Sequence, residues 1–263
     1  MTWYEGVLLG VVQGATEFLP VSSSGHLVMG QTLLGVEAPG VELEVALHLA
    51  TLLSVLIAYR GRIAELALGA VHGDRAQLGY LGLLALATVP TAVVGVALRD
   101  LLSTLFELPV VTGAALLCTG AVLWTARAAL RRTPEARVGV GAALLVGLAQ
   151  ATAIVPGISR SGMTTVAALW KGISPGEAAA FSFLLSVPAV AGAAALELSG
   201  PLGELGGVAP GVLLGASVAA CATGVAAISV FRAMLGRRSL HRFAPYLWVV
   251  GAAFLWSLSG DAA

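Results

Sequence analysis

Charged residues are scarce in this sequence: Asp, Glu, Lys and Arg make up 11% of its 263 residues, against roughly 25% in ordinary soluble domains. The nine hydrophobic residue types supply 58%, so polar side chains are too few to cover a water-facing surface. The formal net charge of zero gives no basic footprint for nucleic acid. These shortages exclude a soluble enzyme, a disordered chain and a nucleic-acid partner, and they predict a polytopic membrane protein.

Cysteine and N-terminal positive charge are also rare. The two cysteines, Cys118 and Cys221, both lie inside apolar runs and cannot form a disulfide framework. We therefore expect them to be buried small apolar residues. The first five residues, Met1–Glu5, include no basic side chain, so we expect no cleavable signal peptide.

Apolar runs divide the chain into ten segments, and six of them are long enough to cross a bilayer, which takes roughly 17–25 helical residues. These six are 41–60, 78–99, 108–130, 176–197, 208–232 and 244–260. The segments 22–35 and 158–170 are too short, with 14 and 13 residues. Each follows a longer segment, 2–19 or 138–155, after an immediate turn. We interpret each pair as a re-entrant helical hairpin rather than a short tilted span, because its two helices are joined by a tight turn and one of them is too short to cross the bilayer. Such a broken backbone is tolerated at membrane depth only inside protein or beside a wet cavity.

Basic residues are distributed unevenly between the two sides that these segments define. If each hairpin returns to its own side, Arg99 falls on the side of the N-terminus. The opposite side receives Arg60, Arg62, Arg75, Arg127, Arg131, Arg132, Arg137, Lys171, Arg232, Arg237, Arg238 and Arg242. The positive-inside rule makes that opposite side cytoplasmic, so both termini are predicted to face outward.

An internal repeat relates the two hairpins. A shift of 137 residues aligns Gln13 with Gln150, Ser22 with Ser159, Ser24 with Ser161 and Gly25 with Gly162. The halves, approximately 1–132 and 138–263, each contain one hairpin and three spans. Because three is odd, the second half starts on the opposite face and the repeat is inverted. The predicted fold is therefore one all-α integral membrane domain, residues 1–263, whose two hairpins meet near the midplane.

Polar residues collect at the two hairpin turns. Glu17 and Arg160 are the formal charges there, although a charge at the centre of a membrane helix costs about 2.5–3.5 kcal/mol. A buried pair that only pins the halves together would not explain the surrounding hydroxyl groups and His26. Gly and Ser before a helix leave N–H groups free to bind an anion, Arg suits phosphate oxygens, and Ser, carboxylate and imidazole supply a nucleophile and a base. This combination predicts phosphoryl chemistry on a lipid.

The runs QGATEFLPVSSSGH and PGISRSGMT closely resemble the two signature stretches of the undecaprenyl-diphosphatase family, also called bacitracin-resistance proteins. The similarity covers essentially the whole chain. It implies an integral enzyme of the inner (plasma) membrane that hydrolyses undecaprenyl diphosphate to undecaprenyl phosphate and inorganic phosphate, which recycles the lipid carrier of cell-wall synthesis. It also implies an inverted-repeat fold whose active site opens to the outer face.

Matching the family's motifs to this sequence gives the candidate site. The expected catalytic residues are Glu17, Ser23, His26 and Arg160. The expected substrate-binding residues are Gln13, Ser22, Ser24, Ser159, Ser161 and Thr164. Many members have Glu where this chain has Gln13, so a mechanism that needs two carboxylates as metal ligands is in doubt. We expect Glu17 to bind a divalent cation, Mg²⁺ or Ca²⁺, because hard oxygen ligands suit these ions.

Several alternatives stay open at this point. Ser23 is the preferred nucleophile, with Glu17 or His26 as its base, and His26 is the rival nucleophile. A lipid-phosphate flippase or transporter fits the same inverted-repeat architecture. His48 is as consistent with a packing role as with a position facing the site. The oligomeric state is undetermined, and a homodimer is one option.

Overall fold

The computed structural model describes residues 1–34, 42–106, 108–132, 137–198 and 207–260, and every regular element in these ranges is a helix. The helices are α1 (Trp3–Phe18), α2 (Ser23–Leu34), α3 (Glu42–Ala58), α4 (Arg60–Val71), α5 (Arg75–Ala97), α6 (Arg99–Phe106), α7 (Pro109–Ala129), α8 (Val140–Thr152), α9 (Arg160–Trp170), α10 (Pro175–Leu198), α11 (Pro210–Gly236), the 3₁₀ turn η2 (Leu240–Arg242) and α12 (Phe243–Gly260). The prediction of an all-α chain is confirmed.

Each of the ten predicted apolar segments forms a helix, but two further helices were not predicted. The first is α4, which carries Arg60, Arg62 and Glu65 and therefore interrupts any apolar run. It follows α3 after Tyr59 with a bend of 77°. The second is α6, a short helix that begins with Arg99 and Asp100. Both are too polar on one face to be found by searching for continuous apolar sequence.

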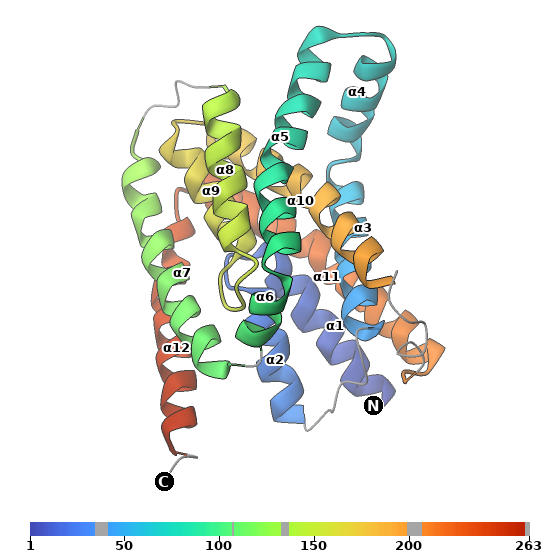
Figure 1. The fold of residues 1–263 in the computed structure, drawn as a ribbon, viewed down its shortest axis with the longest axis vertical. Coiled ribbons are helices and arrows are strands. Elements are labelled where there is room, and N and C mark those ends of the chain that lie inside the picture. Colours follow the sequence, from blue (N-terminus) through green and yellow to red (C-terminus); the bar gives the residue numbers. More distant parts are fainter. Residues whose placement is uncertain (35–41, 107, 133–136, 199–206, 261–263) are drawn as a thin grey trace.

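The chain has the membrane-spanning helices of a polytopic protein. Among the residues that the structure describes, four helices, α5, α7, α10 and α11, are long and apolar enough to cross a membrane, and α3 with α4 would make a fifth if the bent pair counts as one span. The last predicted span, 244–260, is a helix of 18 residues, α12. In Figure 1, α1 begins and α12 ends at one end of the molecule, whereas the turn from α4 to α5 and the carboxyl end of α7 lie at the other.

The two predicted hairpins are present as pairs of short helices. α1 and α2 have 16 and 12 residues, and α8 and α9 have 13 and 11. Figure 1 places the turns of both pairs partway along the long axis of the molecule rather than at either end. Both turns are therefore enclosed by the longer helices, which is where a broken backbone can keep its polar groups satisfied.

Small residues allow the hairpins to lie close to the longer helices. A side chain at Gly10 or Gly14 of α1 would collide with the backbone of α11 at Ala216 or Ala220. Likewise, a side chain at Gly147 of α8 would collide with the backbone of α5 at Ala87. Membrane helices pack through such contacts because lipid gives them little hydrophobic driving force. The glycines thus fix the position of both hairpins.

The cysteine prediction is wrong for one of the two residues. Cys118 is exposed and Cys221 is partly buried. Cys118 lies in α7, whose buried residues include Leu116, Thr119 and Gly120. An apolar sequence context does not distinguish a protein-facing position from a lipid-facing one, because both environments are apolar.

Candidate active site

An ion pair joins the turns of the two hairpins. The Nη2 atom of Arg160, the first residue of α9, donates to Oε1 of Glu17 at 2.6 Å. Both side chains are largely buried, with 16% of Arg160 and 8% of Glu17 exposed. The two residues are 143 positions apart in the sequence, yet they are direct partners. The structure therefore brings the predicted Glu17 and Arg160 together at one point.

The second carboxylate oxygen of Glu17 accepts hydrogen bonds from two residues of the first hairpin. Oε2 accepts a hydrogen bond from Oγ of Ser23 at 2.5 Å and another from Nε2 of Gln13 at 3.1 Å. Gln13 lies one helical turn before Glu17, so both side chains share a face of α1. The carboxylate therefore contacts the preferred nucleophile directly, and it is placed to accept the proton of that hydroxyl group.

Two buried polar atoms beside this carboxylate have no protein partner. They are Nη1 of Arg160, a donor, and Oε1 of Gln13, an acceptor. Oε1 of Gln150, which lines the cavity described below, is unpartnered as well. A buried polar group without a hydrogen bond costs about 1–3 kcal/mol, so these atoms are candidates for binding a ligand. A phosphate oxygen would satisfy the guanidinium donor, and a cation or a hydrogen-bond donor would satisfy the amide oxygen.

A cavity of about 420 Å³ opens beside the ion pair. Six of the ten predicted site residues line it: Glu17, Ser22, Ser23, Ser24, Ser159 and Arg160. Its remaining walls are mostly apolar and include Leu27, Val45 and Val190. A polar end and an apolar wall in one cavity suit an amphipathic ligand that has an anionic group at the end of a hydrocarbon chain.

Two helices begin at this cavity. Ser23 is the first residue of α2 and Arg160 is the first residue of α9. Ser159 caps α9 by accepting a hydrogen bond from the N–H of Gly162 at 3.2 Å. The amino ends of both helices contribute positive potential to the polar end of the cavity, which favours an anion.

The turn before α2 holds Ser22 in an unusual conformation. Its φ of 70° lies in the left-handed region, which costs a residue other than glycine roughly 1–2 kcal/mol. Ser22 is buried, and its Oγ lies 3.3 Å from Oγ of Ser24. The strained turn places the three consecutive serines, Ser22 to Ser24, in the wall of the cavity.

Ser161 and Thr164 were predicted to bind substrate, but the structure places both within the protein framework. Oγ of Ser161 donates to the carbonyl of Leu19 in the other hairpin at 3.3 Å. Oγ1 of Thr164 donates to the carbonyl of Arg160 at 2.7 Å and lies 2.5 Å from Oγ of Ser182. Neither residue lines the cavity. These hydroxyl groups hold the first turn of α9 in position.

His26 also lies outside the cavity lining. Its Nδ1 atom is 2.9 Å from the carbonyl oxygen of Ser22, and its Nε2 atom is 2.6 Å from the hydroxyl group of Tyr246. The two rings stack with their centroids 5.8 Å apart. Both ring nitrogens therefore have partners, and the geometry ties α2 to α12.

The cavity includes polar residues that were not among the predicted site residues. Glu44 and His48 of α3, Thr91 of α5 and Gln150 of α8 all line it. Nε2 of Gln150 donates to Oγ1 of Thr91 at 3.2 Å. The repeat that aligns Gln150 with Gln13 was the available signal for Gln150, whereas no pattern in the sequence indicated Thr91.

His48 brings an imidazole group to the cavity. Its Nδ1 atom lies 2.7 Å from the carbonyl oxygen of Glu44, one turn earlier in α3. Because a carbonyl only accepts, Nδ1 carries the proton, and Nε2 of the neutral ring is left with a free lone pair. Both His48 and Glu17 line the cavity. His48 therefore faces the site and is equipped to accept a proton.

Among the described residues, no three His, Cys, Asp or Glu side chains form a metal-binding cluster. The carboxylate of Glu17 and the unpartnered Oε1 of Gln13 are nevertheless two neighbouring oxygen donors. Mg²⁺ is commonly held by one or two protein oxygens together with water and substrate phosphate. These donor types suit Mg²⁺ or Ca²⁺. Both oxygens of Glu17 already accept hydrogen bonds, and Gln13 is buried outside the cavity lining.

The second hairpin is supported from α7 by one buried hydroxyl group. Oγ1 of Thr119 donates to the carbonyl of Gly157 at 3.1 Å and accepts from the N–H of Ser159 at 3.2 Å. We expect Thr119→Val to lower the free energy of unfolding by about 1–3 kcal/mol, because it leaves two buried backbone groups unpaired. Thermal unfolding in detergent measures the effect.

Two variants serve as controls for this prediction. Thr119→Ser keeps the hydroxyl group and should unfold close to the wild type. Thr104→Val changes an exposed threonine whose hydroxyl group donates to the carbonyl of Asp100 in its own helix, α6, and should have an effect within about 0.5 kcal/mol. A melting temperature of Thr119→Val equal to that of Thr104→Val would contradict the supporting role.

Comparison with known proteins agrees with the geometry. Residues 6–253 match the model of the bacitracin resistance protein BacA family. The undecaprenyl-diphosphatase of Desulfatibacillum aliphaticivorans is 43% identical, with 97% of this chain and 98% of the relative covered. That of Salinibacter ruber is also 43% identical, over 98% of this chain and the whole relative, and that of Desulforapulum autotrophicum is 37% identical, over 95% and 96%. This chain belongs to the bacitracin resistance protein BacA family.

Proposed function

We propose that this chain is an undecaprenyl-diphosphatase, a membrane enzyme that releases inorganic phosphate from undecaprenyl diphosphate and leaves the lipid monophosphate. The observation that carries the proposal is the cavity in which Ser23, Glu17 and Arg160 meet beside an apolar wall. The undecaprenyl-diphosphatases that cover nearly the whole chain at 37–43% identity support the same reaction.

Arg160 and the two helix ends bind the diphosphate. Nη2 of Arg160 is held by Glu17, and Nη1 is free to donate to a phosphate oxygen. The amino ends of α2 and α9 add positive potential on either side. The apolar wall near Leu27 and Val190 receives the first part of the prenyl chain. This arrangement places the terminal phosphorus atom next to Ser23 and neutralises charge as the phosphoryl group is transferred.

Ser23 attacks the terminal phosphorus atom. As its Oγ forms the new P–O bond, the hydroxyl proton passes along the 2.5 Å hydrogen bond to Oε2 of Glu17. The bond between the terminal phosphorus and the bridging oxygen breaks, and undecaprenyl phosphate leaves with the electron pair. The products of this step are a phosphoserine at Ser23 and a protonated Glu17.

His48 activates the water of the second step. Its Nε2 atom accepts a proton as water attacks the phosphoserine, and the departing Oγ of Ser23 takes back the proton from Glu17. Inorganic phosphate is released, and His48 returns its proton to the solvent. His48 supplies the base that this step needs, because Glu17 is already protonated and His26 lies outside the cavity lining.

A divalent cation completes the site in this proposal. Glu17 and Oε1 of Gln13 would hold Mg²⁺ or Ca²⁺. When bound, the cation supplies further charge neutralisation for the phosphate oxygens. Gln13 takes the place of a carboxylate found in many family members, so the protein offers one negative ligand rather than two.

The distribution of basic residues supports an orientation in the plasma membrane. The turn from α4 to α5 and the carboxyl end of α7, which carry Arg75, Arg127 and Arg131, lie opposite the end where α1 begins (Figure 1). The positive-inside rule makes the arginine-rich end cytoplasmic. The cavity, which includes Glu44 near the start of α3 and Phe106 at the end of α6, then opens toward the outer face.

Arg160 is predicted to be essential for phosphate release. Arg160→Lys keeps the charge and the partner of Glu17 but loses the planar fork, and we expect its rate to fall at least about 10²-fold, by analogy with the loss of one donor to a transition state. Phosphate release from undecaprenyl diphosphate in detergent measures the rate, and the absence of a transmembrane gradient there separates an enzyme from a carrier.

The matched control is Arg62→Lys, which changes a partly exposed arginine that pairs with Glu65 outside the cavity and should leave the rate unaltered. Arg160→Ala should lose activity as well, with a lower melting temperature because Glu17 is left buried and unpaired. Phosphate release near the wild-type rate in either Arg160 variant would show that the residue does not bind the transferred group.

His48 is predicted to affect the second step and spare the first. In His48→Gln we expect steady-state turnover to fall by about 10²–10⁴-fold, the usual contribution of a general base, while a burst of undecaprenyl phosphate equal to the enzyme concentration remains. Mass spectrometry of the quenched reaction should find phosphate on Ser23.

The double variant Ser23→Ala/His48→Gln is the control and should show neither the burst nor the phosphopeptide. If His48→Gln turns over slowly without a burst, His48 does not act in the second step. A phosphopeptide that contains His26 instead of Ser23 would favour the rival nucleophile.

Removal of divalent cations is predicted to stop turnover. We expect a chelator to reduce phosphate release and added Mg²⁺ or Ca²⁺ to restore it, because the phosphate oxygens then face a single guanidinium group. Gln13→Glu should bind the cation more tightly, since it adds a negative ligand. Full activity after exhaustive chelation would rule out the metal at Glu17 and leave the roles of Ser23 and Arg160 intact.

A further inference from the structure

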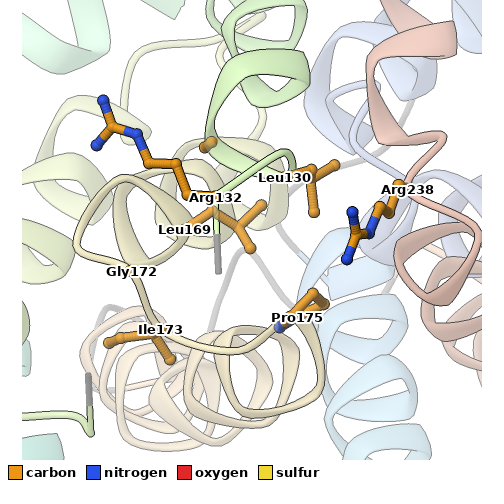
Figure 2. Close-up of a pocket in the computed structure, with 8 residues that line it drawn as sticks. Leu130, Arg132, Leu169, Gly172, Ile173, Pro175 and Arg238 are labelled. Atoms are coloured by element: carbon orange, nitrogen blue, oxygen red, sulfur yellow. The ribbon is translucent and has the colours of Figure 1, made fainter. Parts of the chain in front are cut away.

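A group of arginines surrounds two adjoining cavities at the end of the molecule opposite the start of α1. The first cavity, about 380 Å³, is lined by Arg127, Leu130, Arg131, Arg238 and His241. The second is much smaller, about 30 Å³; it shares Leu130 and Arg238 with the first and adds Arg132, Leu169 and Ile173. Figure 2 shows Arg132 and Arg238 on opposite sides of this second cavity. We call the two together the basic cavity.

The described lining of the basic cavity carries positive charge without a counter-charge. Among the residues that the structure describes, neither part is lined by Asp or Glu. Within the described ranges, the ion pairs are Arg62 with Glu65 and Arg160 with Glu17, so Arg127, Arg132 and Arg238 have no carboxylate partner there. The positive-inside rule accounts for basic residues at this end. It does not account for their convergence on one hollow, since dispersed arginines would orient the protein equally well.

Aromatic contacts and a strained turn fix the guanidinium groups. Arg127 lies over the ring of Trp124 at 4.4 Å, and Arg132 lies over Trp170 at 4.7 Å. Arg238 has a φ of 54° just after α11 ends, a position where helices usually have glycine. This strain of roughly 1–2 kcal/mol places the Arg238 side chain in both cavities. Arginines held in this way lose little entropy when they bind a phosphate.

His241 lies in the electrostatic field of these arginines. Burial lowers the pKa of its imidazole group, the nearby charges of Arg127, Arg242 and Arg131 lower it further, and a backbone hydrogen bond with Arg238 acts in the opposite direction. The positive charge of the basic cavity therefore comes from its arginines.

The surroundings favour a lipid over a dissolved anion. The second cavity is walled by Leu130, Leu169 and Ile173. Trp124 and Trp170 are 40% and 36% exposed beside the arginines, and half-exposed tryptophans are typical of the level of lipid headgroups. Basic pockets between membrane helices on the cytoplasmic side bind anionic headgroups.

We propose that the basic cavity binds the headgroup of an anionic phospholipid in the leaflet opposite the active site. Arg127, Arg131 and Arg238 contact the phosphate oxygens in the larger cavity, and the acyl chains extend into the surrounding bilayer. This site is separate from the catalytic cavity and shares none of its lining residues.

Native mass spectrometry of the full-length protein tests the proposal. The protein is extracted from vesicles of equal parts phosphatidylglycerol and phosphatidylcholine, and the lipid that it retains is counted. We expect the wild type to retain phosphatidylglycerol selectively. In Arg127→Gln/Arg131→Gln/Arg238→Gln the selectivity should fall at least about tenfold, whereas phosphate release from undecaprenyl diphosphate in detergent should stay at the wild-type rate.

The matched control is Arg60→Gln/Arg75→Gln/Arg137→Gln, which removes the same charge from exposed positions that line neither cavity. Arg238→Gln alone is the fallback if the triple variant does not fold, and it should still weaken retention. If both triple variants lose the same selectivity for phosphatidylglycerol, the lipid is attracted by the overall positive charge rather than by a specific site, and the proposal is wrong. Displacement of the lipid by millimolar inorganic phosphate would also overturn it, because the cavity would then be an inorganic-anion site.

Discussion

The buried ion pair between Glu17 and Arg160 is the interaction on which the rest of the structure depends. Burying two charges costs several kcal/mol per ion, and only good geometry with further hydrogen bonds offsets that cost. Here a 2.6 Å contact joins the charges, and Ser23 and Gln13 satisfy the second carboxylate oxygen. The pair can form only if both hairpin turns reach the same depth. The broken helices, the close glycine contacts and the capped start of α9 all serve that requirement.

The hydrogen bonds around this ion pair are not all satisfied within the protein. One guanidinium nitrogen and the oxygen of Gln13 remain buried without partners. A pair whose purpose was stability would be expected to satisfy these atoms, since each costs about 1–3 kcal/mol. In the proposed reaction the free guanidinium nitrogen of Arg160 binds the diphosphate. Phosphate binding would then complete an arrangement that the protein holds at some cost in stability, a common property of preorganised sites.

Sequence patterns predicted the helices that consist of continuous apolar runs. They did not predict the amphipathic helices, or the contacts between residues far apart in the sequence. All ten segments became helices, whereas the polar helices α4 and α6 were missed. The motif residues Glu17, Ser23 and Arg160 do meet, but no spacing revealed that Thr119 supports Ser159 from 40 residues away. His48 illustrates the same limit: its helix was predicted, but the face that it presents depends on how α3 packs. The inverted relation of the halves stays a prediction.

Arginine side chains line two separate cavities in this molecule. The two cavities differ in the other side chains that line them. At Arg160 a carboxylate, a serine and an imidazole group line the same cavity, and the proposed reaction needs this combination for its nucleophile and its base. The basic cavity around Arg238 is lined instead by arginines, aliphatic side chains and the imidazole group of His241, with Trp124 and Trp170 beside the arginines. Its described lining includes neither a serine nor a carboxylate that could act as a nucleophile or a base. The buried carboxylate of Glu17, which is costly at this depth, therefore distinguishes the proposed catalytic cavity from the proposed lipid-binding cavity.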